Sequence, residues 1–178
     1  MKCITILTLA LKIEANDMNA YLFSCPVNHE ILYLIASVER SKKRELGYPY
    51  LISFNSKKEK KQAKKIAKFI WIDNRTVDCL DAQNCTQALS FLLENKIINL
   101  DIGPYQLNYK YHKLKLSDYF NVKQSYIYAC NLIYNNIKKY GYSWDTIAKY
   151  HSYTKKHKEK YLKLLARNIK KIKNEVSK

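Results

Sequence analysis

One glutamate stands where a helix is expected to end, and that position favours acid–base chemistry. Apolar residues recur at helical spacing from Ile31 to Val38, after an Asn28 that can cap a helix. Glu39 therefore falls in the final turn, where the helix macrodipole places partial negative charge. That field and a partly apolar cleft are expected to raise the pKa of its carboxyl group. A general acid needs a raised pKa near neutral pH, so this position would suit one, although a surface glutamate at a helix end is the plainer interpretation of the residue taken alone.

A second segment, residues 99–108, reads Asn-Leu-Asp-Ile-Gly-Pro-Tyr-Gln-Leu-Asn and predicts a turn that could hold a polar ligand. Gly103 lets the backbone approach a ligand closely. The amide of Gln106 can donate and accept hydrogen bonds, and Tyr105 offers an aromatic ring on which a sugar could stack. Together with Asn108, these residues form a candidate binding turn.

The third segment, residues 148–152, reads Ala-Lys-Tyr-His-Ser. An acid at a helix end, then a Gly/Gln/Asn turn, then a Tyr-rich helix end resembles the lytic transglycosylases of the lysozyme-like superfamily. The likeness is to the subset that carries Tyr-His-Ser in the third motif. That subset also has a Tyr-His pair after the turn, here at 111–112, and a Gly-x-Pro-Tyr-type segment after the acid, here at 47–50. The resemblance extends from about Cys25 to about Asn168.

The resemblance implies a mainly helical, lysozyme-like α+β fold with a small β-containing lobe inserted after the catalytic helix. Its members cut the glycan strands of peptidoglycan with one carboxylate and no cofactor. Here Glu39 would protonate the oxygen that links N-acetylmuramic acid to N-acetylglucosamine. It would then take a proton from the muramyl C6 hydroxyl, which closes on C1 to give a 1,6-anhydro product.

The resemblance also implies roles around the acid. The Tyr of the third motif is bonded to the catalytic acid in the family, so Tyr150 is expected to orient Glu39. His151 is expected to hold the same loop, although a core or capping histidine is the plainer interpretation. Ser53 matches a serine that faces the substrate in the family.

Three other functions remain open. A hydrolytic muramidase would need a second carboxylate, for which Asp101 is the nearest candidate, although an Asp before a Gly turn commonly bonds local backbone. A basic nucleic-acid-binding module is supported by the lysine clusters. A catalytically inactive wall-binding protein is hinted at by Arg40 and Pro104, which replace the residues usual in the family.

The formal net charge is +17, and it is concentrated in residues 57–68 and 155–178. Such clusters are typical of nucleic-acid binding, of attraction to an anionic polymer, or of plain solvated faces. Lys greatly outnumbers Arg, the better residue for reading bases and clamping phosphates. Solvated faces are therefore the favoured interpretation, and nucleic acid is not an expected partner.

The N-terminus indicates export. A positive start, an apolar run from Ile4 to Leu11, and small residues at Ala15 and Ala20 together are typical of a signal peptide over residues 1–20. The run is too short for a transmembrane anchor. A single domain over residues 21–178 would follow, located in the periplasm or cell envelope. Peptidoglycan would be its partner, with an envelope-spanning secretion or conjugation machine as a further one by resemblance.

Cysteine usage fits an oxidising compartment. Cys79 and Cys85 flank a polar stretch suited to a small disulfide loop, and Cys25 and Cys130 could form a second bridge. Four buried thiols in a cytosolic protein are the alternative. The sequence has no Cys-x-x-Cys pair and no His-Glu-x-x-His helix, so no metal site is predicted.

The remaining elements follow from periodicity and caps. Residues 48–54 predict an edge strand or extended segment opened by a proline. Residues 57–67 predict a basic helix, with Ile66, Phe69 and Ile70 turning inward. Further helices are expected from Thr86, from Ser125 to a Gly141 cap, and after a Ser143 cap. A last helix places apolar residues on one face: Tyr161, Leu164, Leu165, Ile169 and Ile172.

Overall fold

A computed structural model describes residues 25–39 and 41–176 of the 178-residue chain. The predicted signal peptide and Arg40 lie outside those residues. The described residues form six α-helices and one small antiparallel sheet, so the prediction of a mainly helical α+β fold is confirmed at that level.

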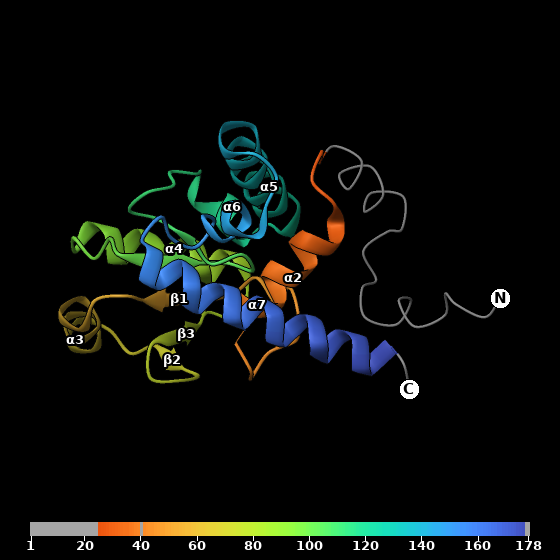
Figure 1. Ribbon diagram of the computed structural model, residues 1–178. Coiled ribbons are helices and arrows are strands. Elements are labelled where there is room, and N and C mark those ends of the chain that lie inside the picture. Colours follow the sequence, from red (N-terminus) through yellow and green to blue (C-terminus); the bar gives the residue numbers. More distant parts are fainter. Residues whose placement is uncertain (1–24, 40, 177–178) are drawn as a thin grey trace.

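Four helices form one half of the molecule. They are α2 (His29–Glu39), α5 (Val122–Tyr140), α6 (Trp144–Ala148) and α7 (Lys155–Val176). Helix α2 contacts both α5 and α7, and α6 contacts the same two helices, so α2 is held between neighbours (Figure 1). The Asn28 side chain caps α2 as predicted, accepting a hydrogen bond from the Glu30 amide at 2.8 Å.

The other half is built on a five-stranded sheet with strand order β2-β3-β1-β4-β5. The strands are β1 (Leu51–Phe54), β2 (Ile70–Trp71), β3 (Thr76–Asp78), β4 (Leu100–Ile102) and β5 (Leu107–Asn108). Strand β1 pairs with β3 on one side and β4 on the other, so the prediction of an edge strand is wrong. Pro49 precedes the strand, and its missing amide therefore does not interrupt the ladder.

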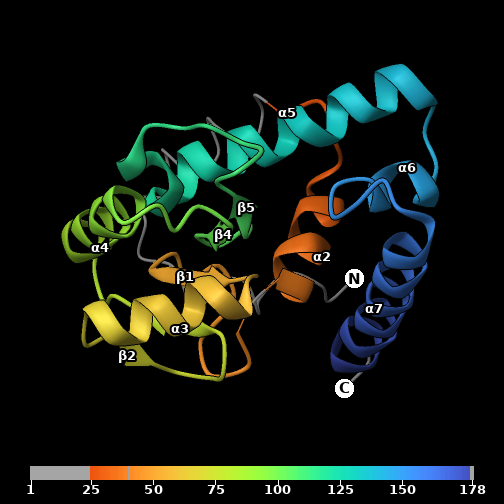
Figure 2. The same ribbon diagram turned by 90° about the vertical axis from the view of Figure 1, so that its left-hand side faces the viewer.

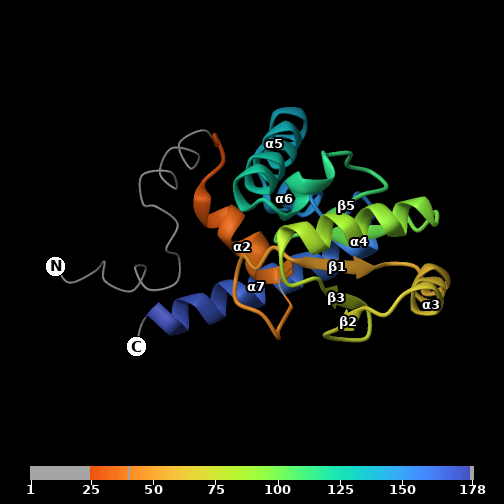
Figure 3. The same cartoon turned by 180° about the vertical axis from the view of Figure 1, so that it is seen from behind.

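Alternation along β1 separates the two faces of the sheet. Ile52 and Phe54 join the core beneath α4 (Ala82–Glu94), whereas Leu51 and Ser53 line a cleft on the other face. Figure 3 shows α4 lying across β1, with α3 (Lys57–Ile66) at the outer end of the sheet. The short 3-10 helix η1 (Leu116–Phe120) packs on α4 and α5 and closes this side.

Both predicted disulfides are present. Cys25–Cys130 joins the segment before α2 to α5, and Cys79–Cys85 joins the end of β3 to α4. In the chain-entropy account, a bridge that closes a loop of 105 residues contributes about 4.7 kcal/mol. The two bridges are compatible with a secreted protein. Within the described part of the chain, no helix has the length and apolarity that a membrane span requires.

Several element boundaries differ from the sequence prediction. Helix α4 is capped by Asp81, not by Thr86, whose hydroxyl bonds back to Ala82 inside the helix. Helix α5 begins three residues before Ser125, after an Asn121 cap. Of the apolar residues expected to turn inward at and after the end of α3, Ile66 and Ile70 are exposed, and Leu164 of α7 is exposed as well.

Candidate functional site

A cleft of about 350 Å³ lies where the helical half meets the sheet. The C-terminal end of α2 forms one side, and β1 with the β2–β3 turn forms the other. Figure 2 shows α2 between the sheet and α7, with its C-terminal end directed between them. The lining residues are Val38, Glu39, Ser41, Leu51, Ser53, Asp73, Asn74, Arg75, Thr76 and Gln106.

Glu39 is the last residue of α2, and the last turn of that helix carries no basic residue. Its side chain is only 15% exposed, and its Oε1 atom is buried without a hydrogen bond to any described residue. Burial raises the pKa of Glu39 to about 7, and the negative charge of Asp101 adds to the rise. A large share of the Glu39 side chains therefore carry a proton near neutral pH.

The hydroxyl of Tyr161, on α7, acts on the Glu39 carboxyl group. The side chain is 1% exposed, and its hydroxyl lacks a hydrogen bond of ordinary geometry to any described residue. It nevertheless faces Glu39 closely enough to lower the pKa of that carboxyl, which partly offsets the effect of burial. Sequence analysis identified Tyr161 only as a core residue, because its spacing on α7 carries no sign of a neighbour on α2.

His151 lies beside this pair. Its ring stacks on the Tyr161 ring at 4.6 Å between centroids, with 2° between the planes. Its Nδ1 atom is 3.9 Å from Glu39 Oε1, which is beyond hydrogen-bond distance. Burial lowers the pKa of His151, so the ring is mainly neutral near pH 7. Almost half of the side chain is exposed, so it is not a buried core histidine.

Tyr150 does not make the bond that the resemblance implied. Its hydroxyl donates to the Tyr105 carbonyl oxygen at 2.6 Å, and not to the Glu39 carboxylate. The Glu39 charge still contributes to a pKa of Tyr150 well above its ordinary value, after burial as the larger cause. Tyr150 therefore ties the third segment to the binding turn and borders the acid from that side.

The turn 103–106 is held mainly by its own bonds. Gly103 has a φ of +73°, and a Cβ atom there would overlap the Tyr119 carbonyl oxygen, so only glycine fits. Gln106 adopts a φ of +47°, and its side-chain nitrogen donates to the Gly103 carbonyl at 2.9 Å. Gln106 still lines the cleft.

Tyr105 contradicts the prediction of an aromatic platform for a sugar. The residue is only 7% exposed, and its ring meets the Tyr126 ring edge to face at 6.1 Å. Tyr105 therefore packs into the core on the inner side of the turn.

A row of polar side chains crosses the sheet on its cleft side, from four adjacent strands. Pairing aligns Thr76, Ser53, Asp101 and Asn108 in that order. The Ser53 and Thr76 hydroxyls lie 3.0 Å apart, and Asn108 donates to Asp101 Oδ1 at 2.7 Å. Ser53 lines the cleft, although it is only 2% exposed.

The side chain of Asn108 forms hydrogen bonds with neighbouring residues of the protein. Its nitrogen also donates to Asn99, at 3.1 Å, and its oxygen accepts from the Lys110 amide at 3.0 Å. It therefore joins β5 to β4 and is not among the residues that line the cleft.

Asp101 has a charged partner. Its Oδ2 atom lies 3.3 Å from Arg75 Nη2, and Arg75 also donates to Asn55 at 3.2 Å. The expectation that Asp101 is a local cap or turn former is therefore wrong. Arg75 was missed by sequence analysis, because its partners are 20 and 26 residues away in the chain.

A buried cluster fixes the chain that follows Glu39. Asp78 has a fully buried side chain, which accepts hydrogen bonds from the Arg44 side chain, from the Tyr48 hydroxyl at 2.8 Å and from the Leu80 amide at 2.8 Å. Burial and the bond to Asp78 raise the pKa of Tyr48 to about 12. Residues 41–50 are thus attached to β3, directly beside the Cys79–Cys85 bridge.

Within the described residues, no group of three His, Cys, Asp or Glu side chains is placed to hold a metal ion. Comparison with protein-family models, curated proteins and solved structures gives no match. The site therefore has to be interpreted from its own geometry. A carboxyl group with a pKa raised to about 7 lies on one wall of the cleft and faces a wall of polar side chains, an arrangement able to protonate a bound ligand.

Proposed function

We propose that the protein is a peptidoglycan lytic transglycosylase with a lysozyme-like fold, in which Glu39 is the sole acid and base. The observation that carries the proposal is the buried Glu39 carboxyl, with its pKa raised to about 7, in a polar cleft. A group that must first give and then take a proton works best when its pKa lies near the working pH. Asp101 is paired with Arg75, and Asp73 of the cleft accepts the Arg75 and Thr76 amides, whereas Glu39 Oε1 has no hydrogen bond to the described residues, which supports a mechanism with one acid.

In the proposed reaction, Glu39 gives one proton and takes one back. The protonated carboxyl gives its proton to the oxygen between N-acetylmuramic acid and N-acetylglucosamine as the bond from C1 to that oxygen breaks. The resulting carboxylate takes the proton of the muramyl C6 hydroxyl, whose oxygen bonds to C1. Glu39 ends protonated, and one strand ends in a 1,6-anhydro sugar. Water does not enter the reaction, so no second carboxylate is needed to activate it.

The neighbouring residues have supporting roles in this proposal. Tyr161 and His151 border the acid, Ser53 and Gln106 line the surface that the sugar would contact, and Tyr150 anchors the turn that carries Gln106. Action on peptidoglycan implies location in the periplasm or cell envelope, with which the two disulfides are compatible. Service to an envelope-spanning secretion or conjugation machine is part of the same proposal.

The test is mass spectrometry of the muropeptides released when purified peptidoglycan is incubated with the protein. Anhydro-muramyl products are expected from the wild type and not from Glu39→Gln. Glu30→Gln is the matched control, because it removes an exposed carboxylate from the other end of α2. The absence of products from a folded wild-type protein would contradict the proposal.

A hydrolytic muramidase is the second candidate, and the position of Asp101 favours it. The Asp101 charge acts on Glu39 and raises its pKa, so the two carboxyl groups share one electrostatic environment. Reducing ends in place of anhydro ends, lost in Asp101→Asn, would identify this activity. Anhydro ends that persist in Asp101→Asn would exclude it.

A further inference from the structure

We propose that Asn74 and Arg75, at one end of the cleft, form a carboxylate subsite together with their neighbours Asn55 and Lys60, and that this subsite binds the acidic group on the muramyl unit of the glycan. That group is the lactyl carboxylate in a strand without peptides, or a stem-peptide carboxylate in a substituted strand. The inference rests on the proposed function, because it names the substrate feature that the same cleft selects.

Three elements converge on this subsite. Lys60 lies on α3, Asn74 and Arg75 lie on the β2–β3 turn, and Asn55 follows β1. Each cation is held by an amide oxygen: Lys60 donates to Asn74 at 3.4 Å, and Arg75 donates to Asn55 at 3.2 Å. The neighbouring Asp73 fixes the turn by accepting the Arg75 and Thr76 amides, both at 2.8 Å. The cations are therefore positioned before any ligand arrives.

Arg75 retains hydrogen-bonding capacity for a ligand. A guanidinium has five N–H donors, and the bonds to Asn55 and Asp101 use one donor on each terminal nitrogen. The side chain is 48% exposed. A planar fork of this kind binds a carboxylate through two parallel hydrogen bonds, which a lysine cannot reproduce.

Asp101 pairs with Arg75 and Asp73 lines the same end of the cleft, but the neighbouring lysines of α3 carry positive charge without paired acids. Among the described residues, no lysine of α3 forms an ion pair. The acid of that helix, Glu59, directs Oε1 to the amides of Ile98 and Asn99 inside the protein. The charge on Lys60 is thus not neutralised locally, and a carboxylate ligand would meet an attractive field at this end of the cleft.

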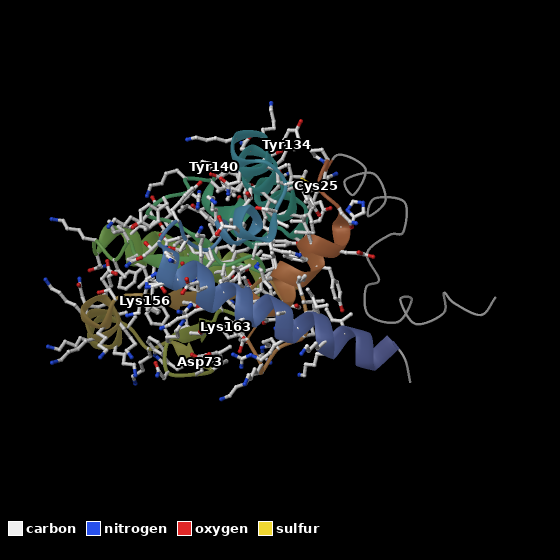
Figure 4. The ribbon with its side chains drawn as sticks, in the orientation of Figure 1. Cys25, Asp73, Tyr134, Tyr140, Lys156 and Lys163 are labelled. Carbon is white, nitrogen blue, oxygen red and sulfur yellow. A yellow bond between two sulfur atoms is a disulfide. The ribbon has the colours of Figure 1, made fainter. Side chains whose placement is uncertain are left out.

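The subsite and the acid belong to one cleft. Arg75, Asn74 and Glu39 all line it, and the Arg75 charge reaches far enough to lower the pKa of Glu39. Figure 4 shows the labelled Asp73 of the adjoining turn on the side of the molecule below α7. A muramyl unit held by its carboxylate at Arg75 would thus present its glycosidic oxygen toward the α2 end.

Binding to the Glu39→Gln protein tests the subsite without turnover. The probes are peptide-free glycan strands, strands that retain stem peptides, and chitin oligosaccharides, which are neutral. Adding Arg75→Gln is expected to weaken binding of the carboxylated strands roughly tenfold to a hundredfold, the range for a charge-assisted pair, and to leave chitin binding unchanged. Loss confined to peptide-free strands identifies the lactyl group, and loss confined to substituted strands identifies the stem peptide.

Three further variants sharpen the test. Arg75→Lys keeps the charge without the fork and is expected to lose an intermediate amount of affinity. Lys60→Gln is expected to lose less than Arg75→Gln. Lys65→Gln is the matched control, because five residues place it about 140° around α3 from Lys60, and no change is expected.

Equal weakening for charged and neutral probes in Arg75→Gln would overturn the subsite, since it would indicate a merely structural role through Asp101. Unchanged binding of every probe would overturn it as well. Failure of the proposed function has a different signature: the carboxylate preference is observed, but the wild type leaves no new chain ends. Anhydro ends made equally well by wild type and Arg75→Gln, at equal KM, would instead refute the subsite and leave the function standing.

Discussion

Two buried carboxylates adjoin the loop 41–50, and they differ in their hydrogen bonds: Glu39 precedes the loop in the chain, and Asp78 bonds its side chains. Asp78 accepts hydrogen bonds from an arginine, a tyrosine and a backbone amide. Glu39 has an Oε1 atom without any hydrogen bond to the described residues and a pKa raised to about 7. A buried carboxylate with all its partners stabilises a structure, whereas one without them costs stability and is kept where its proton is used.

The largest expected effect comes from removing the unsatisfied acid. Glu39→Gln should reduce release of anhydro-muropeptides by about 10²- to 10⁴-fold, the usual contribution of a positioned acid–base group. Product release over time, measured by chromatography and mass spectrometry, gives the rate ratio. Asp78→Asn, compared at a temperature where it is folded, should lose far less activity. Equal losses in the two variants would remove the functional distinction between the carboxylates.

Replacing the satisfied carboxylate should destabilise the fold. Asp78→Asn changes a fully buried acceptor of the Tyr48 hydroxyl and the Leu80 amide and is expected to lower the free energy of unfolding by about 1–3 kcal/mol. Urea denaturation followed by circular dichroism measures it. Asp81→Asn is a suitable control. Asp81 lies three residues after Asp78, it is an exposed capping carboxylate, and asparagine caps a helix about as well. A loss below about 1 kcal/mol in Asp78→Asn would contradict the role given to the cluster.

The pH dependence of stability should separate the two carboxylates as well. Glu39 titrates near 4.5 in the unfolded chain and near 7 in the folded protein. Between these pH values the folded state holds a proton that the unfolded state releases, so the contribution of Glu39 to stability falls as pH rises from about 4.5 to about 7. The full difference corresponds to about 3 kcal/mol.

Unfolding measured at pH 4 and pH 8 tests this sign. Glu39→Gln should be more stable than the wild type at pH 8, and the difference should shrink toward pH 4. Glu30→Gln, at the exposed end of the same helix, provides the control. A wild type that gains stability relative to Glu39→Gln as pH rises would show that the pKa of Glu39 is not raised.

Sequence reasoning was most successful where the signal is local. Helical spacing and an Asn28 cap placed Glu39 at the end of its helix, close cysteine spacing indicated the Cys79–Cys85 disulfide, and Cys25 and Cys130 were named as a candidate second pair. It failed where a contact joins distant segments. The pairs of Asp78 with Arg44 and of Arg75 with Asp101 leave no periodic trace, and a strand between two neighbours has the same composition as an edge strand. The resemblance to transglycosylases supplied the choice of Glu39 and stays a prediction.

The smallest expected effect concerns Tyr161, whose hydroxyl stabilises the charged form of the Glu39 carboxyl group. Because this hydroxyl lowers the pKa of Glu39, Tyr161→Phe should raise that pKa and move the alkaline limb of the pH–rate profile to higher pH, with little change in the maximal rate. Rates measured from pH 5 to pH 9 give the position of the limb. Tyr150→Phe is the comparison, because that hydroxyl bonds the Tyr105 carbonyl and not the acid, so it should loosen the turn. A limb that moves more in Tyr150→Phe than in Tyr161→Phe would return the orienting role to Tyr150, as the family resemblance implied.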